Sequence, residues 1–139
     1  MSEHTRRFHI GDILSVIHDR LVSPDHIDGL YRLLGWMVNE AGVMTHQLPR
    51  LSRECEGFLR ETFPDLSELD VAAAMERIKP TSLADIAAWF AELETDGVDL
   101  YRDVPRLPEV DHTPIDPLTE LRMLRPDAEV IVVRADDES

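Results

Sequence analysis

The sequence predicts one mostly helical α+β domain, with five to six helices and a minor sheet formed by short N-terminal and C-terminal strands. Apolar residues recur at helical spacing in several stretches between residues 13 and 124. Only residues 6–10 and 128–135 read as strands. The 139 residues fit a single domain, 1–139, and we expect residues 1–6 and 136–139 to be frayed.

The N-terminal third predicts a strand followed by two helices. Residues 6–10, RRFHI, alternate apolar and polar side chains, as in a strand with one buried face. Asp12 can then cap a helix over residues 13–21. A second helix runs over residues 24–40, where Ser23 is a favourable N-cap and a proline occupies the first helical position.

Three further helices follow in the middle of the chain. Residues 49–62 place apolar side chains on one face, with a proline at the start. Residues 65–79 are expected to form one helix, in which Asp65 and Glu68 resemble a capping pair. A fifth helix covers residues 83–96 and stops at a glycine.

The character of the chain changes after residue 97. Residues 98–117 contain four prolines and scattered apolar residues, which predicts an extended arm lying over the domain. A short helix should start at Pro117. Residues 128–135, AEVIVVRA, then read as a strand that could pair with residues 6–10.

Charge is the strongest global feature of the sequence. The net charge is −14, from 28 acidic and 14 basic residues. Residues 65–139 hold 19 of the acids and 7 of the bases. This excess disfavours direct binding to nucleic acid or to an anionic membrane, and it favours a basic protein surface as partner. Genome-wide composition bias and solubility can equally explain a negative charge.

Two groups of residues are candidates for binding. The first would contact a basic partner and comprises Glu92, Glu94, Asp96, Asp99, Asp103, Glu109, Asp111 and the aromatic Trp36. Trp36 lies off the main apolar stripe of its helix, so it could mark a partner-binding patch or pack against the arm. The second group, His46, Gln47 and Arg50, lies in the loop MTHQLPR and could bind a small ligand or could only hold the loop.

No pattern points to a catalytic residue, a metal ion or a cofactor. The six histidines form no H-x-x-x-H pair. The single Cys55 lies on an apolar helix face, which favours a core residue over a reactive thiol. With one cysteine, no run of the ~18 apolar residues that would span a bilayer, and no secretory signal, the sequence predicts a cytoplasmic protein.

Several phrases of the sequence resemble one family. FHIGDILS, HQLPR, RLSREC, IDPLTELRML and VIVV are similar to an uncharacterised family of small proteins from actinobacteria and their phages, over residues 8–134. The resemblance implies a bacterial or phage cytoplasm and a mobile-element role, and it assigns no site residues.

The first hypothesis is therefore a non-enzymatic acidic protein of phage type that inhibits a host nucleic-acid-binding defence protein, as an anti-CRISPR protein would, by occupying its basic surface. The alternatives are a small-ligand or enzymatic domain built around His46 and Arg50, and a self-associating module with Trp36 in a homodimer face.

Overall fold

The computed structural model describes residues 5–124, and this range has the predicted class, a mostly helical α+β fold. Its helices are α1 (Ile10–Ile17), α2 (Ile27–Val38), α3 (Leu48–Thr62), α4 (Pro64–Glu68), α5 (Val71–Ile78), α6 (Leu83–Thr95) and α7 (Pro117–Leu124). Its strands are β1 (Thr5–His9) and β2 (Tyr101–Pro105). Two short 3-10 helices complete it, η2 (Thr45–Gln47) and η3 (Glu109–Asp111).

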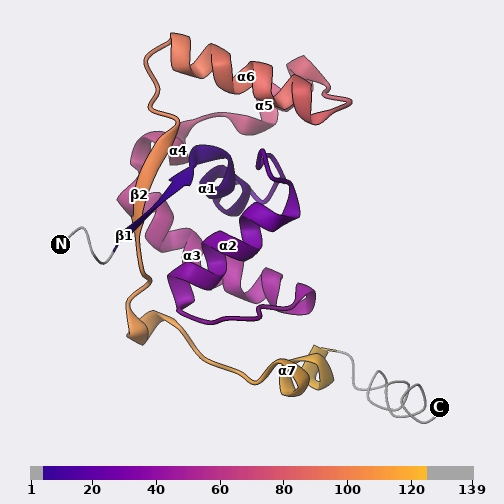
Figure 1. The fold of residues 1–139 in the computed structure, drawn as a ribbon, viewed down its shortest axis with the longest axis vertical. Helices are drawn as coiled ribbons and strands as arrows, with labels where there is room; N and C mark the ends of the chain where they lie inside the picture. The colour runs from indigo at the N-terminus through magenta and orange to yellow at the C-terminus, as the bar shows by residue number, and fades with distance from the viewer. Residues whose placement is uncertain (1–4, 125–139) are drawn as a thin grey trace.

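Helix α1 is the centre of the hydrophobic core. All of its residues are buried, and α2, α3 and α4 pack around it (Figure 1). The apolar stripes of α2 and α3 meet there through Leu33, Leu34, Met37, Leu51, Cys55 and Leu59. Helices α5 and α6 lie at one end of the molecule, and α7 lies at the opposite end. The core is therefore a cluster of helices, with α5 and α6 at one end and α7 at the other.

The sheet in the described range pairs β1 with β2. The strands are antiparallel, with Thr5 opposite Pro105 and His9 opposite Tyr101. Strand β2 lies within the segment that the sequence predicts as an extended arm, and β1 includes two residues assigned to the frayed end. The strand predicted over residues 128–135 lies outside the described residues. The described partner of β1 therefore comes from the middle of the second half of the chain.

Helix α1 begins and ends earlier than the sequence predicts. The expectation that Asp12 is the N-cap is wrong, because His9 Nδ1 accepts a hydrogen bond from Gly11 N at 2.8 Å and starts the helix at the end of β1. Asp12 is instead buried in the first turn, where it accepts a hydrogen bond from Ser23 Oγ. The chain leaves the helix before Asp19, whose φ of 51° is left-handed.

Helix α2 is shorter than predicted at both ends. Residues 24–26 form a turn, and the positive φ of His26, 58°, keeps them out of the helix. Ser23 nevertheless accepts a hydrogen bond from Asp25 N at 3.2 Å. At the other end, Asn39 adopts a left-handed conformation and stops the helix.

The predicted fourth helix is two helices, α4 and α5. The single-helix expectation is wrong because Asp70 interrupts the run and caps α5, accepting a hydrogen bond from Ala73 N at 2.9 Å. Asp65 and Glu68 do not form the expected capping pair. Asp65 instead binds the Arg102 guanidinium through both carboxylate oxygens, at 3.1 and 2.8 Å.

The remaining helices agree with the sequence. Helix α3 starts with its proline in the first turn, and α6 ends before Gly97, whose φ is +95°. Between α6 and α7 the chain lies against the core, since Val104 and Leu107 are buried and Leu107 N donates to Met37 O at 2.8 Å. This stretch brings α7 alongside the loop before α3.

Candidate functional site

The loop MTHQLPR holds the C-terminal part of the described chain in place. Its His46 Nε2 lies 2.7 Å from the carbonyl oxygen of Pro117, the first residue of α7. Gln47 is fully buried, and its Oε1 accepts a hydrogen bond from Met44 N at 2.8 Å. Both side chains therefore have a structural role, one between segments and one within the loop.

The Arg50 side chain is likewise engaged by contacts within the protein. Its guanidinium binds Glu120 with two hydrogen bonds of 2.8 and 2.9 Å, and it also donates to Glu54 and to Thr113 O, each at 2.7 Å. The Glu120 side chain is 3% exposed, and the pairing with Arg50 holds its pKa below the usual range. The geometry thus favours the structural interpretation of this loop, and ligand binding there stays a prediction.

His112 extends this network between two carboxylates. Its Nδ1 lies 2.6 Å from Glu54 Oε1, and its Nε2 lies 2.6 Å from Glu40 Oε2. Burial acts to lower the pKa of His112, but the hydrogen bonds and charges of the two carboxylates outweigh it and raise the pKa. A protonated imidazole can donate to both carboxylates at once, so charge links the segment after α2, helix α3 and the chain before α7.

Trp36 packs against β2 and the residue that follows it. Its Nε1 donates a hydrogen bond to Val104 O at 2.8 Å. The Arg106 guanidinium lies 3.7 Å from the centre of the Trp36 ring, and it also donates to Trp36 O. Of the two roles considered from the sequence, packing on the arm is the one that these contacts favour.

The seven acidic side chains predicted to meet a partner are all exposed. In the described part of the chain only one of them forms an ion pair, Glu92 with Arg77 at 3.3 Å. The two bases of the same stretch are directed inwards, because Arg102 binds Asp65 and Arg106 stacks on Trp36. The stretch from Glu92 to Asp111 therefore presents carboxylates whose charge is largely uncompensated.

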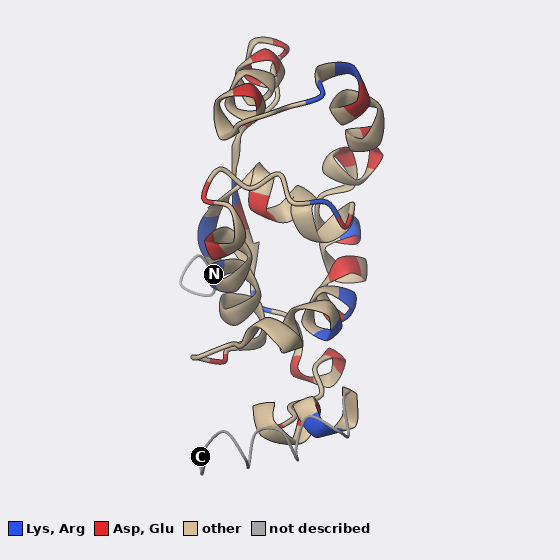
Figure 2. Cartoon of the chain, turned by 90° about the vertical axis from the view of Figure 1, so that its right-hand side faces the viewer, with Lys and Arg blue, Asp and Glu red and all other residues tan. Residues whose placement is uncertain are grey.

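These acids follow one edge of the molecule. In Figure 1 the chain leaves the end of α6, descends as β2 and continues towards α7 along that edge. The carboxylates are thus strung out over the length of the fold and do not form a compact patch. Figure 2 shows that other acidic positions are also spread from one end of the molecule to the other.

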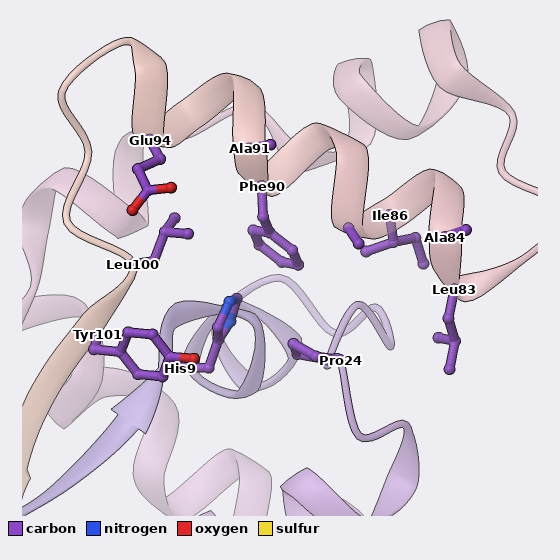
Figure 3. Close-up of a pocket in the computed structure, with 11 residues that line it drawn as sticks. His9, Pro24, Leu83, Ala84, Ile86, Phe90, Ala91, Glu94, Leu100 and Tyr101 are labelled. Carbon is purple, nitrogen blue, oxygen red and sulfur yellow. The ribbon is translucent and has the colours of Figure 1, made fainter.

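The structure also contains a groove that the sequence does not reveal. It has a volume of about 460 Å³, lies beneath α6, and is lined mainly by apolar side chains (Figure 3). His9 projects into it, with its ring edge-on to Phe90 and Tyr101 at centroid distances of 4.6 and 5.1 Å. Burial lowers the pKa of His9, and because Nδ1 accepts from Gly11 N, the neutral ring carries its hydrogen on Nε2.

The groove can therefore offer the His9 Nε2–H as a hydrogen-bond donor within mainly apolar walls. In the sequence, the alternation of apolar and polar residues around His9 predicts a strand and gives no sign of a groove. The aromatic neighbours come from α6 and β2, far away in sequence, so no local pattern could have identified the groove.

Other chemistry has little support in the described residues. Between residues 5 and 124 no three His, Cys, Asp or Glu side chains are arranged to hold a metal ion. Cys55 is buried in the core, and burial raises the pKa of its thiol to about 12. At neutral pH this thiol is protonated and therefore a poor nucleophile. In the same range no helix has the length and apolar character needed to cross a membrane.

One family model matches part of the chain. The family model described as Domain of unknown function (DUF7736) matches residues 8–69. The expected resemblance to an uncharacterised family is confirmed over this segment, which runs from the end of β1 through α4. No curated protein and no solved structure matches the chain. The match covers the helical core and the loop before α3, and it ends before the acidic edge.

Proposed function

We propose that this chain is a non-enzymatic binding protein that occupies the basic, nucleic-acid-binding surface of another protein. The observation that carries the proposal is the exposed and largely unpaired row of carboxylates from Glu92 to Asp111. Carboxylates held on a folded edge can replace the phosphates of a nucleic-acid backbone in a basic groove.

The inward direction of the two bases in this row supports the proposal. If Arg102 and Arg106 extended into solvent, they would neutralise part of the charge that a basic partner would meet. Their contacts with Asp65 and Trp36 hold them against the protein surface, and the seven exposed carboxylates of the row outnumber these two bases, so the row keeps a net negative charge.

The cellular setting is part of the same proposal. The phrases shared with proteins of actinobacteria and their phages support a phage or mobile-element protein that acts in the bacterial cytoplasm. A host defence nuclease is then a suitable class of target, because it must carry a basic groove for nucleic acid. Blocking that groove would be an anti-defence activity of the anti-CRISPR kind.

The test starts from a tagged chain that captures partners from a nuclease-treated actinobacterial lysate, with elution in rising salt and identification by mass spectrometry. The purified partner is then mixed with labelled DNA or RNA, and the tagged chain is added as competitor. We expect displacement of the nucleic acid, with an affinity that falls steeply as salt rises, because exposed charge attraction is screened.

A charge-reversal variant gives the decisive comparison. Changing Glu92, Glu94, Asp96 and Asp99 together to Lys should abolish displacement. The matched control reverses four exposed acids on other elements that have no ion pair among the described residues, Asp19, Glu61, Glu68 and Glu76. Equal loss in both variants would mean that only total charge matters, and retained displacement in the first would overturn the proposal.

Self-association is the competing explanation for exposed side chains that lack partners within the described residues. Sizing by light scattering over a range of protein concentrations separates the two, because a dimer formed through the Trp36 face would change mass without any partner. A dimer that persists in the charge-reversal variant would support a self-associating module.

A further inference from the structure

Three arginines converge on one hollow of this acidic protein. The hollow has a volume of about 380 Å³ and lies over the outer side of α2. Arg6 reaches it from β1, Arg32 from α2, and Arg106 from the chain after β2. Because these segments are far apart in sequence, only the fold brings the guanidinium groups together. We propose that this hollow binds the phosphate group of a small phosphate ester that also carries an aromatic ring, such as a mononucleotide.

The charges in the hollow are available to an anion. Arg6 makes no ion pair with the described residues and lies over the Phe8 ring at 5.4 Å. Within residues 5–124 the Arg106 guanidinium donates to neutral acceptors alone, Trp36 O and Asn39 Oδ1, so no carboxylate there compensates its positive charge. Arg32 is paired with Asp25, but both side chains are exposed, so the pair is weak and open to competition.

One acid also lines the hollow, and its charge is already engaged. Glu40 Oε2 lies 2.6 Å from His112 Nε2. The hollow therefore has three cationic side chains and one carboxylate that is bound to an imidazole. Arginine is well suited to this task, because its planar guanidinium forms paired hydrogen bonds with phosphate oxygens.

Aromatic and small residues complete the hollow. Tyr31 and Trp36 line it together with the small residues Gly35, Ala41 and Gly42. A Cβ added at Gly42 would have no atom within 4 Å, which shows open space there. A flat ring attached to the phosphate has room to contact these side chains, so a nucleotide should bind more tightly than phosphate alone.

The test is a titration of the ¹⁵N-labelled chain with AMP at constant ionic strength. The protein has two indole N–H signals, and they serve as an internal pair: Trp36 lies in the hollow, whereas Trp89 is buried elsewhere. We expect the Trp36 signal to shift in a saturable way while the Trp89 signal stays in place. Inorganic phosphate should displace AMP, and adenosine without phosphate should not bind.

Variants assign the binding to the hollow. Arg6→Gln and Arg32→Gln should each raise the dissociation constant of AMP at least fivefold, since each removes a cation from the hollow. Arg53→Gln is the control, because Arg53 is exposed on α3, outside the hollow, and has no ion pair among the described residues.

Three results would overturn the proposal: no saturable shift at millimolar AMP, an equal response of both indoles, or an equal effect of the control variant. If inorganic phosphate bound as tightly as AMP, the hollow would be assigned to the phosphate group alone and the aromatic part of the proposal would be wrong. The acidic edge is unchanged in these variants, so failure here leaves the proposed function to its own test.

Discussion

Removing the Arg50 guanidinium should detach α7 and the segment before it from the helical core. Arg50 binds Glu120 with two hydrogen bonds, which join α3 to α7 across 70 residues of sequence. It also binds Glu54, one turn further along α3. Arg50→Gln removes the charge and leaves the Glu120 carboxylate, which is 3% exposed, without its guanidinium partner. A buried carboxylate without a partner must either regain water or become protonated.

The size of the effect follows from the burial of the two partners. Removing one partner of a fully buried ion pair costs roughly 3–5 kcal/mol. Arg50 is 15% exposed, so part of the interaction is already screened by solvent, and we expect a loss of about 2–3 kcal/mol. If α7 detaches before the core unfolds, the global free energy of unfolding falls by less, and the loss appears as local opening instead.

Two measurements separate these outcomes. Urea unfolding gives the global free energy, and limited proteolysis with mass spectrometry reports opening between residues 108 and 116. A double-mutant cycle with Glu120→Gln isolates the pair, and Arg53→Gln on the same helix is the control. The reasoning is refuted if Arg50→Gln changes stability by less than about 0.5 kcal/mol and the segment stays protected from protease.

Two other predictions concern pH and packing. His112 has a raised pKa in the folded protein, so protonation of its ring stabilises the folded state. This stabilisation is complete at pH values below the unfolded pKa of about 6.5 and is lost as the pH rises through the folded pKa. Protease protection of residues 108–116 should therefore decrease with rising pH in the wild type, and His112→Gln should remove this dependence. Gly29→Ala should destabilise the protein by about 2 kcal/mol in urea unfolding, because its Cβ would lie 2.2 Å from both Asp12 Oδ1 and Ser23 Oγ. The control Gly57→Ala, with no atom within 4 Å, should instead be neutral or stabilise by up to about 1 kcal/mol, and equal effects at both glycines would contradict this explanation.

Asp12 shows where local patterns mislead. In sequence it stands before an apolar helical repeat, which is the usual position of a cap. In the fold it is buried, bonded to Ser23, and burial raises its pKa. The cap is His9, because the chain enters α1 directly from β1 and the imidazole is already beside the first free backbone N–H. Which residue caps a helix depends on the direction from which the chain enters that helix, and the spacing of apolar residues in the sequence does not specify that direction.

The sequence by itself determined the helical class, most of the helices and the buried stripe of α3, because those properties depend on residues three and four positions apart. It also determined the excess of acid in the second half of the chain. Only the tertiary structure decided the partner of β1, the joining of Arg50 to Glu120 and the convergence of Arg6, Arg32 and Arg106. Each of these is a contact between segments that are distant in sequence. Its energy depends on how deeply the side chains are buried and on how they are oriented, and the spacing of residues along the chain does not specify either property.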